Sequence, residues 1–252
     1  MDKTKIFAHR GASGYAPENT LEAFALAISQ KADGIELDVQ LTRDGIPVVI
    51  HDETIDRVTS KTGYVKDYTL KELKKLMVME RQFPAYPSSK IPTLEEVLDA
   101  VKASGIWVNI ELKTGIYWYP EIEQKVARIV QKCEMEQKVI YSSFNHYSIQ
   151  KIKQIVPDAE TAYLYSDVIW NVTDYAKNTE VDGLHPAVYH MKMADFLNEY
   201  IKSGLNVRVW TVNDTTDMKW LIETGVTAVI TNYPDVAVKI REQRENQNHA
   251  GK

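Results

Sequence analysis

The feature that most constrains the fold of this chain is a regular alternation of short apolar runs with amphipathic, helix-like segments. Strands that alternate with helices in this way form parallel βαβ units. Eight such units within 252 residues favour a single closed α/β barrel over an open doubly wound sheet. The eight strand-like runs lie at residues 6–9, 34–42, 107–113, 138–144, 161–165, 182–186, 206–213 and 227–234.

Several of the helix-like segments carry start signals. Asn19 and Glu22 resemble a capping box before the first helix, and Thr93 and Glu96 open another. A helix is therefore expected after most of the strands. Near the carboxyl end, helices are predicted at about residues 190–203, 215–223 and 234–244.

One stretch interrupts this rhythm. Roughly forty residues separate the apolar run 46–50 from the helix opened by Thr93, and within them Thr69–Met79 is predicted as a short helix. We therefore expect one barrel domain, residues 1–245, with a small inserted subdomain at about residues 52–92 over one rim. The polar, aperiodic residues 246–252 are expected to form a flexible tail.

The charge balance excludes one class of partner. With 30 Lys and Arg against 35 Asp and Glu, the net charge is −5, so no extended basic surface for nucleic acid is expected. The amino-terminal residues form no apolar stretch long enough for a signal peptide or a membrane span, so we expect a cytoplasmic protein without stable membrane anchoring. The single cysteine, Cys133, occupies an apolar helical position and is expected to be an inert core thiol.

Two of the strand-like runs alternate apolar and charged residues. In GIELDVQLT, Glu36 and Asp38 share one face, and in WVNIELK the same holds for Asn109, Glu111 and Lys113. One interpretation is a pair of edge strands with a solvated face. The helical connections instead require parallel strands covered by helices, which directs the polar faces into the barrel. Buried carboxylates in that interior require a compensating cation or strong donors.

The donor set indicates which cation would bind. Glu36, Asp38 and Glu111 offer only hard oxygen ligands, and no cysteine lies near them in the sequence. Such ligands are typical of Ca²⁺ or Mg²⁺ sites rather than of structural Zn²⁺ sites. One divalent cation is therefore the predicted cofactor.

Two histidines complete a candidate catalytic set. His9 and Arg10 lie where the first strand enters its loop, and His51 ends the run 46–50, so we expect both histidines at the carboxyl ends of strands, where barrel active sites are built. A lone histidine is more often a surface or core residue. Two imidazoles beside a phosphodiester can divide proton transfer, one accepting from the nucleophile and one donating to the leaving alkoxide. The cation, Arg10 and Lys113 would hold the non-bridging oxygens.

Longer motifs resemble one known family. HRGASGYAPENTLEAF at residues 9–24, ELDVQLTRDGIPVVIHDETIDRVT at residues 36–59, and ELK at residues 111–113 are similar to the signature of bacterial glycerophosphodiester phosphodiesterases. The resemblance implies a TIM barrel with an insertion where this chain has one. It also implies hydrolysis of glycerophosphodiesters to an alcohol and sn-glycerol 3-phosphate.

The resemblance also implies roles for individual residues. It assigns metal ligation to Glu36, Asp38 and Glu111, acid–base catalysis to His9 and His51, phosphate contacts to Arg10 and Lys113, and a substrate contact to Trp210. Core packing is an equally good interpretation of Trp210. Phe144 and His185 are placed at strand ends but outside the catalytic set, and Asn232, where the family often has Asp, bears on substrate preference.

Alternatives of mechanism and of function remain open at this level. Water can attack phosphorus directly, or the glycerol 2-hydroxyl can attack first and give a cyclic phosphate, a route that gains from proximity. An enzyme acting on lipid substrates would need an apolar patch at the barrel mouth, whereas the insertion is mixed in character. A phosphodiester-binding protein without catalysis would not need all of these polar residues. The leaving alcohol and the oligomeric state are not determined by the sequence.

Overall fold

The computed structural model describes residues 3–79 and 82–250. Within them, nine strands form one sheet, and eight of these close into a parallel barrel in the order β1, β2, β4, β5, β6, β7, β8, β9 and back to β1. This is the TIM barrel predicted from the alternation of strands and helices, and each predicted strand is present. The strands are β1 Lys5–His9, β2 Gly34–Leu41, β3 Pro47–Val49, β4 Trp107–Leu112, β5 Val139–Ser143, β6 Glu160–Tyr165, β7 Gly183–Pro186, β8 Asn206–Val209 and β9 Ala228–Thr231.

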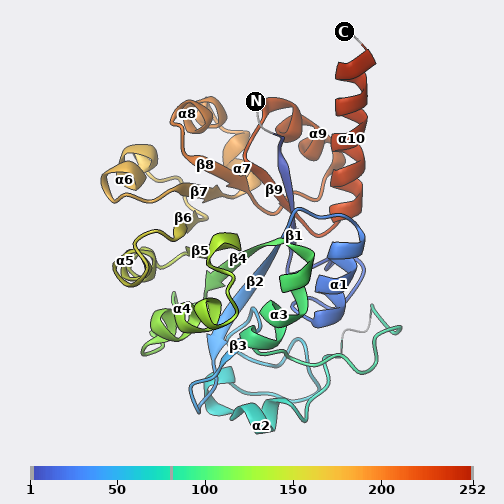
Figure 1. Ribbon diagram of the computed structural model, residues 1–252, viewed down its shortest axis with the longest axis vertical. Helices are drawn as coiled ribbons and strands as arrows, with labels where there is room; N and C mark the ends of the chain where they lie inside the picture. Colours follow the sequence, from blue (N-terminus) through green and yellow to red (C-terminus); the bar gives the residue numbers. More distant parts are fainter. Residues whose placement is uncertain (1–2, 80–81, 251–252) are drawn as a thin grey trace.

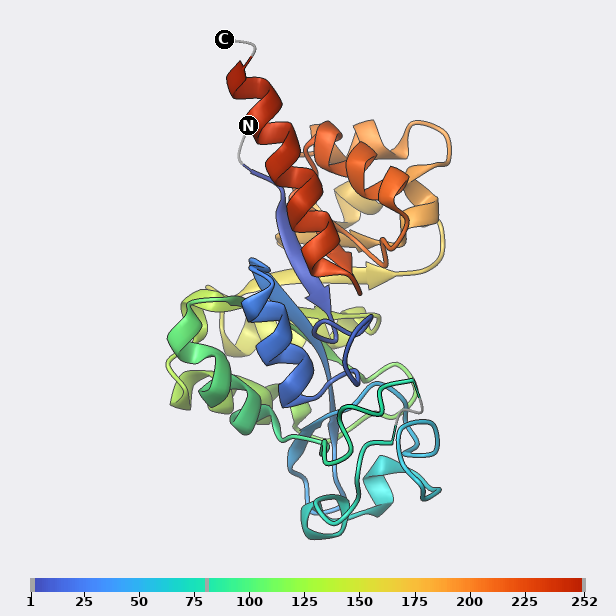
Figure 2. The same cartoon turned by 90° about the vertical axis from the view of Figure 1, so that its right-hand side faces the viewer.

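Helices surround the barrel, while the segment containing α2 lies at one end of the molecule and α10 extends from the other (Figures 1 and 2). As predicted, Thr93 and Glu96 form a capping box at the start of α3. None of the described helices is long and apolar enough to cross a bilayer. The α-helices are α1 Leu21–Ser29, α2 Leu70–Leu73, α3 Leu94–Val101, α4 Ile122–Lys132, α5 His146–Ile155, α6 Val172–Asn178, α7 Val188–Met191, α8 Phe196–Lys202, α9 Thr215–Thr224 and α10 Pro234–Ala250.

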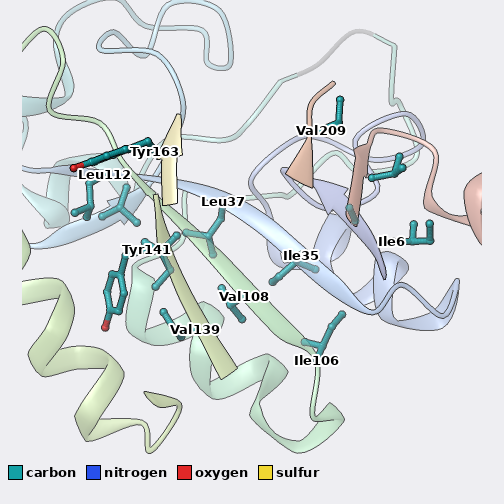
Figure 3. Packing of buried hydrophobic residues seen from close by; sticks show 14 of the residues in the cluster. Ile6, Ile35, Leu37, Ile106, Val108, Leu112, Val139, Tyr141, Tyr163 and Val209 are labelled. Carbon is teal, nitrogen blue, oxygen red and sulfur yellow. The ribbon is translucent and has the colours of Figure 1, made fainter. Parts of the chain in front are cut away.

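The main core lies between the barrel strands and the helices. Ile35 and Leu37 of β2 and Val108 of β4 are fully buried in it, next to side chains of the neighbouring strands (Figure 3). Burying each such side chain stabilises the fold by about 1.5–3 kcal/mol. Because side chains alternate along a strand, this packing directs the intervening residues, Glu36 and Asn109, into the barrel.

Three helix predictions differ from the structure in extent. The helix expected at about residues 190–203 is two helices, α7 and α8, separated by a short turn. The helix expected at Thr69–Met79 is only α2, one turn long, with Thr69 as its cap. The last helix, α10, continues to Ala250, well past residue 244 and into the segment expected to be a polar tail.

The segment between β3 and α3 has a small buried cluster of its own. β3 pairs antiparallel with β2, Val49 lying opposite Val39, so it is a hairpin partner of a barrel strand and not a barrel strand itself. His51, predicted at the carboxyl end of a strand, lies two residues beyond the end of this antiparallel β3, whose direction an apolar run of five residues does not show. The cluster consists of Val48, Ile50, Ile55, Val58, Val65, Leu73, Val78 and Ile91.

Candidate active site

Three carboxylates meet inside the barrel near the carboxyl ends of β2 and β4. The register of the two strands places Asp38 beside Glu111 and Glu36 beside Asn109. All three carboxylates are buried, and one oxygen from each lies within 4.8 Å of the others. At an effective dielectric constant of about 20, two unit charges at that distance repel by roughly 3–4 kcal/mol. The cluster therefore requires positive charge nearby.

Two cations of the chain supply part of that charge. The backbone N–H of Arg10 donates to Glu36 Oε2 at 2.9 Å, and the Arg10 Nε lies 3.3 Å from Asp38 Oδ2. Lys113 Nζ lies 3.0 Å from Glu111 Oε1 and 3.9 Å from Asp38 Oδ1. The sequence placed all five residues in one site, and the structure brings them together.

The loop after β1 is shaped so that it reaches this cluster. Gly11 has a φ of 79°, and a Cβ at that position would lie 2.7 Å from Ala23. Thr20 caps α1 by accepting from the backbone N–H of Ala23. Asn19, with a φ of 56°, instead donates through Nδ2 to Asp38 Oδ2 at 2.9 Å. The predicted capping box starting at Asn19 is therefore wrong, because this side chain is used to hold a site carboxylate.

The electrostatics of the carboxylates fit a divalent cation. Burial, with the charges of Asp38 and Glu111, raises the pKa of Glu36 well above its usual value. Burial also raises the pKa of Glu111 to about 7, although Lys113 opposes this shift. Burial opposes the ionisation of Asp38, but Arg10 and Lys113 outweigh it and lower its pKa. Asp38 Oδ1 is buried and has no hydrogen-bond partner among the described residues. These oxygens suit Ca²⁺ or Mg²⁺.

His9 faces the carboxylates from the end of β1. Its Nδ1 lies 2.8 Å from Asn232 Oδ1, and because an amide oxygen only accepts, Nδ1 carries the hydrogen. Its Nε2 is left as the acceptor, 4.0 Å from Glu36 Oε2. Burial, followed by the charge of Arg10, lowers the pKa of His9 to about 4. The ring is therefore neutral at pH 7 and able to accept a proton.

His51 reaches the same site from the turn after β3. Gln40 of β2 holds that turn, since its side-chain amide donates to the carbonyls of His51 at 2.8 Å and Asp52 at 2.6 Å. Tyr119 in turn donates to Gln40 Oε1 at 2.8 Å. His51 Nδ1 lies 2.6 Å from Asp52 Oδ1, so the carboxylate fixes the ring and can stabilise an imidazolium. The two histidines thus have different partners, a neutral amide for His9 and a carboxylate here.

Arg57 links the second histidine to the first loop. Its guanidinium donates to both oxygens of Asp52, at 2.7 and 3.1 Å, and to both oxygens of Glu18, at 2.9 and 2.7 Å. Glu18 also accepts from Arg10 at 3.1 Å. Burial opposes the ionisation of Asp52, but the bonds from Arg57 and His51 outweigh it and lower its pKa to about 2. A chain of charged hydrogen bonds therefore runs from His51 to the arginine beside the carboxylates.

A cavity of about 180 Å³ opens between these groups. Trp210 lies in the wall of the cavity, where its indole N–H donates to the carbonyl of His185 at 2.7 Å. The centroid of its ring lies 5.5 Å from that of Phe144, in an edge-to-face arrangement. Phe144 and His185, which are predicted at strand ends outside the catalytic set, line the cavity as well. The complete lining is His9, Arg10, Glu36, His51, Asn109, Glu111, Phe144, Leu164, His185, Trp210 and Ile230.

Comparison with known sequences decides the family. Residues 9–236 match the sequence model of the glycerophosphoryl diester phosphodiesterase family. The chain belongs to this family. It is therefore a phosphoric diester hydrolase, as the resemblance of its motifs implied.

Relatives of this family member match it over nearly their whole length. It is 41% identical over 238 residues to a glycerophosphodiester phosphodiesterase of Caldanaerobacter subterraneus subsp. tengcongensis, covering 94% of this chain and 98% of the relative. It is 44% identical over 246 residues to a glycerophosphodiester phosphodiesterase of Bacillus altitudinis, covering 95% and 99%. A solved phosphodiesterase from Oleispira antarctica, in complex with the product sn-glycerol-3-phosphate, is 28% identical with a TM-score of 0.84, covering 95% and 97%.

In this family member, the side chains that orient the predicted catalytic and metal-binding residues give no signal in the sequence pattern. Asn19, Glu18 and Arg57 lie in loops, where no periodicity assigns a direction to a side chain. The sequence connects Asn232 with substrate preference, and the structure places its side chain against His9. The only signal for Asp52 and Arg57 was their presence in the motif that also contains His51.

Proposed function

We propose that this chain hydrolyses glycerophosphodiesters to an alcohol and sn-glycerol 3-phosphate, with one divalent cation, Ca²⁺ or Mg²⁺, as cofactor. The observation that carries the proposal is the buried cluster of Glu36, Asp38 and Glu111, flanked by two histidines with different partners. The product-bound relative from Oleispira antarctica supports the substrate class. A phosphodiester suits this site, because the site reaches charge balance only when a divalent cation and a monoanion are both bound.

Glu36, Asp38 and Glu111 would hold the cation. When bound, the cation would polarise a phosphoryl oxygen and offset the charge that develops on it. Arg10 and Lys113 would contact the remaining non-bridging oxygens from either side of the carboxylates. With a divalent cation and a diester monoanion present, the formal charges of the three carboxylates and two cations sum to zero.

The two histidines would exchange protons with the reacting oxygens. His9, neutral and with Nε2 free as an acceptor, would take the proton of the attacking hydroxyl as its oxygen bonds to phosphorus. His51, whose ring is held by Asp52, would donate from Nε2 to the alkoxide as its bond to phosphorus breaks. Trp210 would pack on the glycerol carbons. Each proton then has a named donor and acceptor.

Both routes of attack use these residues. In the direct route the attacking hydroxyl belongs to water. In the cyclic route it is the glycerol 2-hydroxyl, and the cyclic phosphate is then opened by water while the histidines exchange roles. We favour the cyclic route because its nucleophile is already held beside phosphorus. We also propose that the hydrolase domain comprises residues 1–245, with an insertion at about residues 52–92.

Release of sn-glycerol 3-phosphate from glycerophosphocholine tests the function. The purified protein is expected to release it with Ca²⁺ or Mg²⁺ present, to stop when EDTA removes the cation, and to resume when either cation is restored. Zn²⁺ addition is the control for ligand hardness, because carboxylate oxygens suit the harder cations. No release with choline, ethanolamine, glycerol or inositol diesters under any of these conditions would favour a binding protein.

Replacing Asn232 with aspartate is expected to raise the pKa of His9 from its value of about 4. A carboxylate in place of the amide oxygen, 2.8 Å from Nδ1, stabilises the imidazolium. A base must be neutral to act, so activity is lost as the pH falls through the pKa of His9. The acid limb of kcat/KM against pH should therefore move upward by about one unit or more.

The matched control for this shift is Asn178→Asp, the same substitution at an exposed position on α6. It should leave the acid limb where it is in the wild type. An acid limb that stays in place in Asn232→Asp, with activity otherwise retained, would assign the base to a group other than His9.

A further inference from the structure

A buried histidine lies on the side of the catalytic cavity that is farthest from β2. His185 of β7 lines the cavity and has no exposed surface. In the closed order of the barrel, β7 is four strands from β2 in either direction, so His185 lies across the barrel from Glu36. Its neighbours in the lining include Leu164, which pairs with it in register, and Trp210. A ligand held on the carboxylate side thus extends toward His185.

The contacts of His185 determine which ring nitrogen carries the hydrogen. Arg208 of β8 places Nη1 of its guanidinium 3.4 Å from Nε2 of His185. A guanidinium only donates, so Nε2 accepts and the hydrogen of a neutral ring is on Nδ1. Burial, followed by the charge of Arg208, lowers the pKa of His185 well below its ordinary value, so the ring is neutral at pH 7. Nδ1 is therefore a hydrogen-bond donor.

This donor has no acceptor in the described protein. Nδ1 of His185 is buried and has no hydrogen-bond partner within residues 3–79 and 82–250. Buried N–H groups are rarely left without an acceptor in native proteins. His190 of α7 is a useful comparison, because its Nδ1 also lacks a partner there. Its Nε2, however, donates to the carbonyl of Ser166 at 3.0 Å, so the unpartnered nitrogen is an acceptor and lies outside the cavity lining. Of these two histidines, only His185 offers an unused donor beside the cavity.

Arg208 is held beside this ring by the barrel itself. Glu160 of β6 forms an ion pair with the guanidinium, and Asn206 donates to the same carboxylate oxygen at 2.9 Å. Gly183, two residues before His185, leaves space for the guanidinium, since a Cβ there would lie 3.0 Å from Arg208 Nη1. The attraction within a buried ion pair seldom exceeds the cost of desolvating it. The place of this pair beside His185 therefore indicates a positioning role.

The proposed orientation of the substrate brings one particular oxygen toward His185. Arg10 and Lys113 would hold the phosphate on the carboxylate side, and Trp210 would pack on the glycerol carbons. The indole N–H of Trp210 donates to the carbonyl of His185, so the surface for those carbons is fixed to the same residue. Of the glycerol oxygens, the one on carbon 1 is farthest along the molecule from phosphorus. It is also an acceptor, which is what the Nδ1–H lacks.

We propose that the Nδ1–H of His185 donates a hydrogen bond to the oxygen on carbon 1 of the glycerol, and so favours glycerol esters over esters that lack this oxygen. This inference rests on the proposed function and names the contact that fixes its specificity. His185 is the specificity-determining residue. Arg208 and Glu160 are positioning residues, because they act by keeping the hydrogen of the ring on Nδ1.

Two substrates that differ only in this oxygen test the contact. Choline release from glycerophosphocholine is compared with release from 2-hydroxypropyl phosphocholine of the same configuration at carbon 2, in which carbon 1 is a methyl group. In the wild type, kcat/KM should be about 10- to 100-fold lower for the second substrate, because the buried Nδ1–H loses its acceptor. In His185→Phe the two substrates should differ by less than about threefold, because the donor is gone.

Two further variants separate a contact from a structural effect. His185→Asn should keep most of the preference, because its amide nitrogen is bonded to Cγ as Nδ1 is and can donate from the same place. His190→Phe is the matched control, a buried histidine with an unpartnered Nδ1 outside the cavity lining, and it should keep the full preference. If His185→Phe does not fold, as judged by circular dichroism, His185→Leu takes its place with the same expected result.

The proposal is overturned if the wild type hydrolyses both substrates equally well, since Nδ1 would then serve bound water or packing alone. A preference that persists unchanged in His185→Phe would overturn it too. No choline release from either substrate by the wild type would reject the proposed function instead. In that case calorimetric binding of sn-glycerol 3-phosphate and of 2-hydroxypropyl phosphate still tests the contact without turnover, and the wild type should bind the first about tenfold more tightly.

Discussion

Replacing His9 with glutamine is expected to lower kcat for glycerophosphocholine by about 10²- to 10⁴-fold, with KM changed by less than about threefold. The neutral ring presents Nε2 to the carboxylate side of the cavity, and glutamine offers no basic nitrogen there. The same substitution at His51 removes the proposed proton donor and should cost a similar factor. Because the two act in one step, the double variant should be little slower than either single variant.

A substrate with a better leaving group separates the two roles. In a glycerophosphodiester of p-nitrophenol, the departing phenolate needs little protonation. His51→Gln should therefore recover much of its rate with this substrate, and His9→Gln should not. The control is His146→Gln, whose ring stacks on Tyr163 at 3.9 Å outside the cavity lining. Equal recovery of both variants would contradict the assignment of base and acid.

The barrel could be predicted because its signals are periodic. Strand-like and helix-like runs alternate along the chain, and the period of two within β2 and β4 places Glu36, Asp38 and Glu111 on one face. Parallel register then makes Asp38 and Glu111 neighbours without further information. The carboxylate cluster was therefore predictable from residue spacing and topology alone.

The contacts that the sequence does not predict lie in segments without such a period. β3 is three residues long and antiparallel, so the position of His51 depends on a hairpin and on bonds from Gln40. Asn19 reaches Asp38 only because its backbone has a positive φ. The bonds of Arg57 to Glu18 join residues 39 positions apart, and their contact is a consequence of how the insertion packs. Loop geometry of this kind is not encoded in the spacing of residue types.

Exposed aromatic residues cannot be grouped from the sequence. They are scattered along the chain, such as Tyr64 in the insertion, Trp118 after β4 and Trp170 after β6. No single stretch of sequence is apolar, and only the barrel brings the segments that follow its strands to one face. A surface assembled from distant segments therefore requires the fold before it can be seen.

The effect of Glu36→Gln on thermal stability is expected to depend on whether a cation is bound to the carboxylate cluster. Without one, Glu36 lies buried beside two other carboxylates, so Glu36→Gln should leave the Tm unchanged or raise it, because it removes repulsion. With saturating Ca²⁺ or Mg²⁺ the wild type should gain about 2.7 kcal/mol at a concentration 100 times Kd, or roughly 5–10 °C in Tm. The variant should lose most of that gain, since it lacks one charged ligand.

Thermal unfolding by circular dichroism, run with EDTA and with each cation, measures both effects in one set of samples. Glu22→Gln on α1 is the matched control, the same substitution outside the cluster, and it should keep the full cation-dependent gain. A cation-dependent gain that survives intact in Glu36→Gln would place the cation elsewhere. If Glu36→Gln has a Tm several degrees below that of the wild type in EDTA, Glu36 is a favourable structural partner of Arg10. The relief of repulsion between the carboxylates is then the smaller effect.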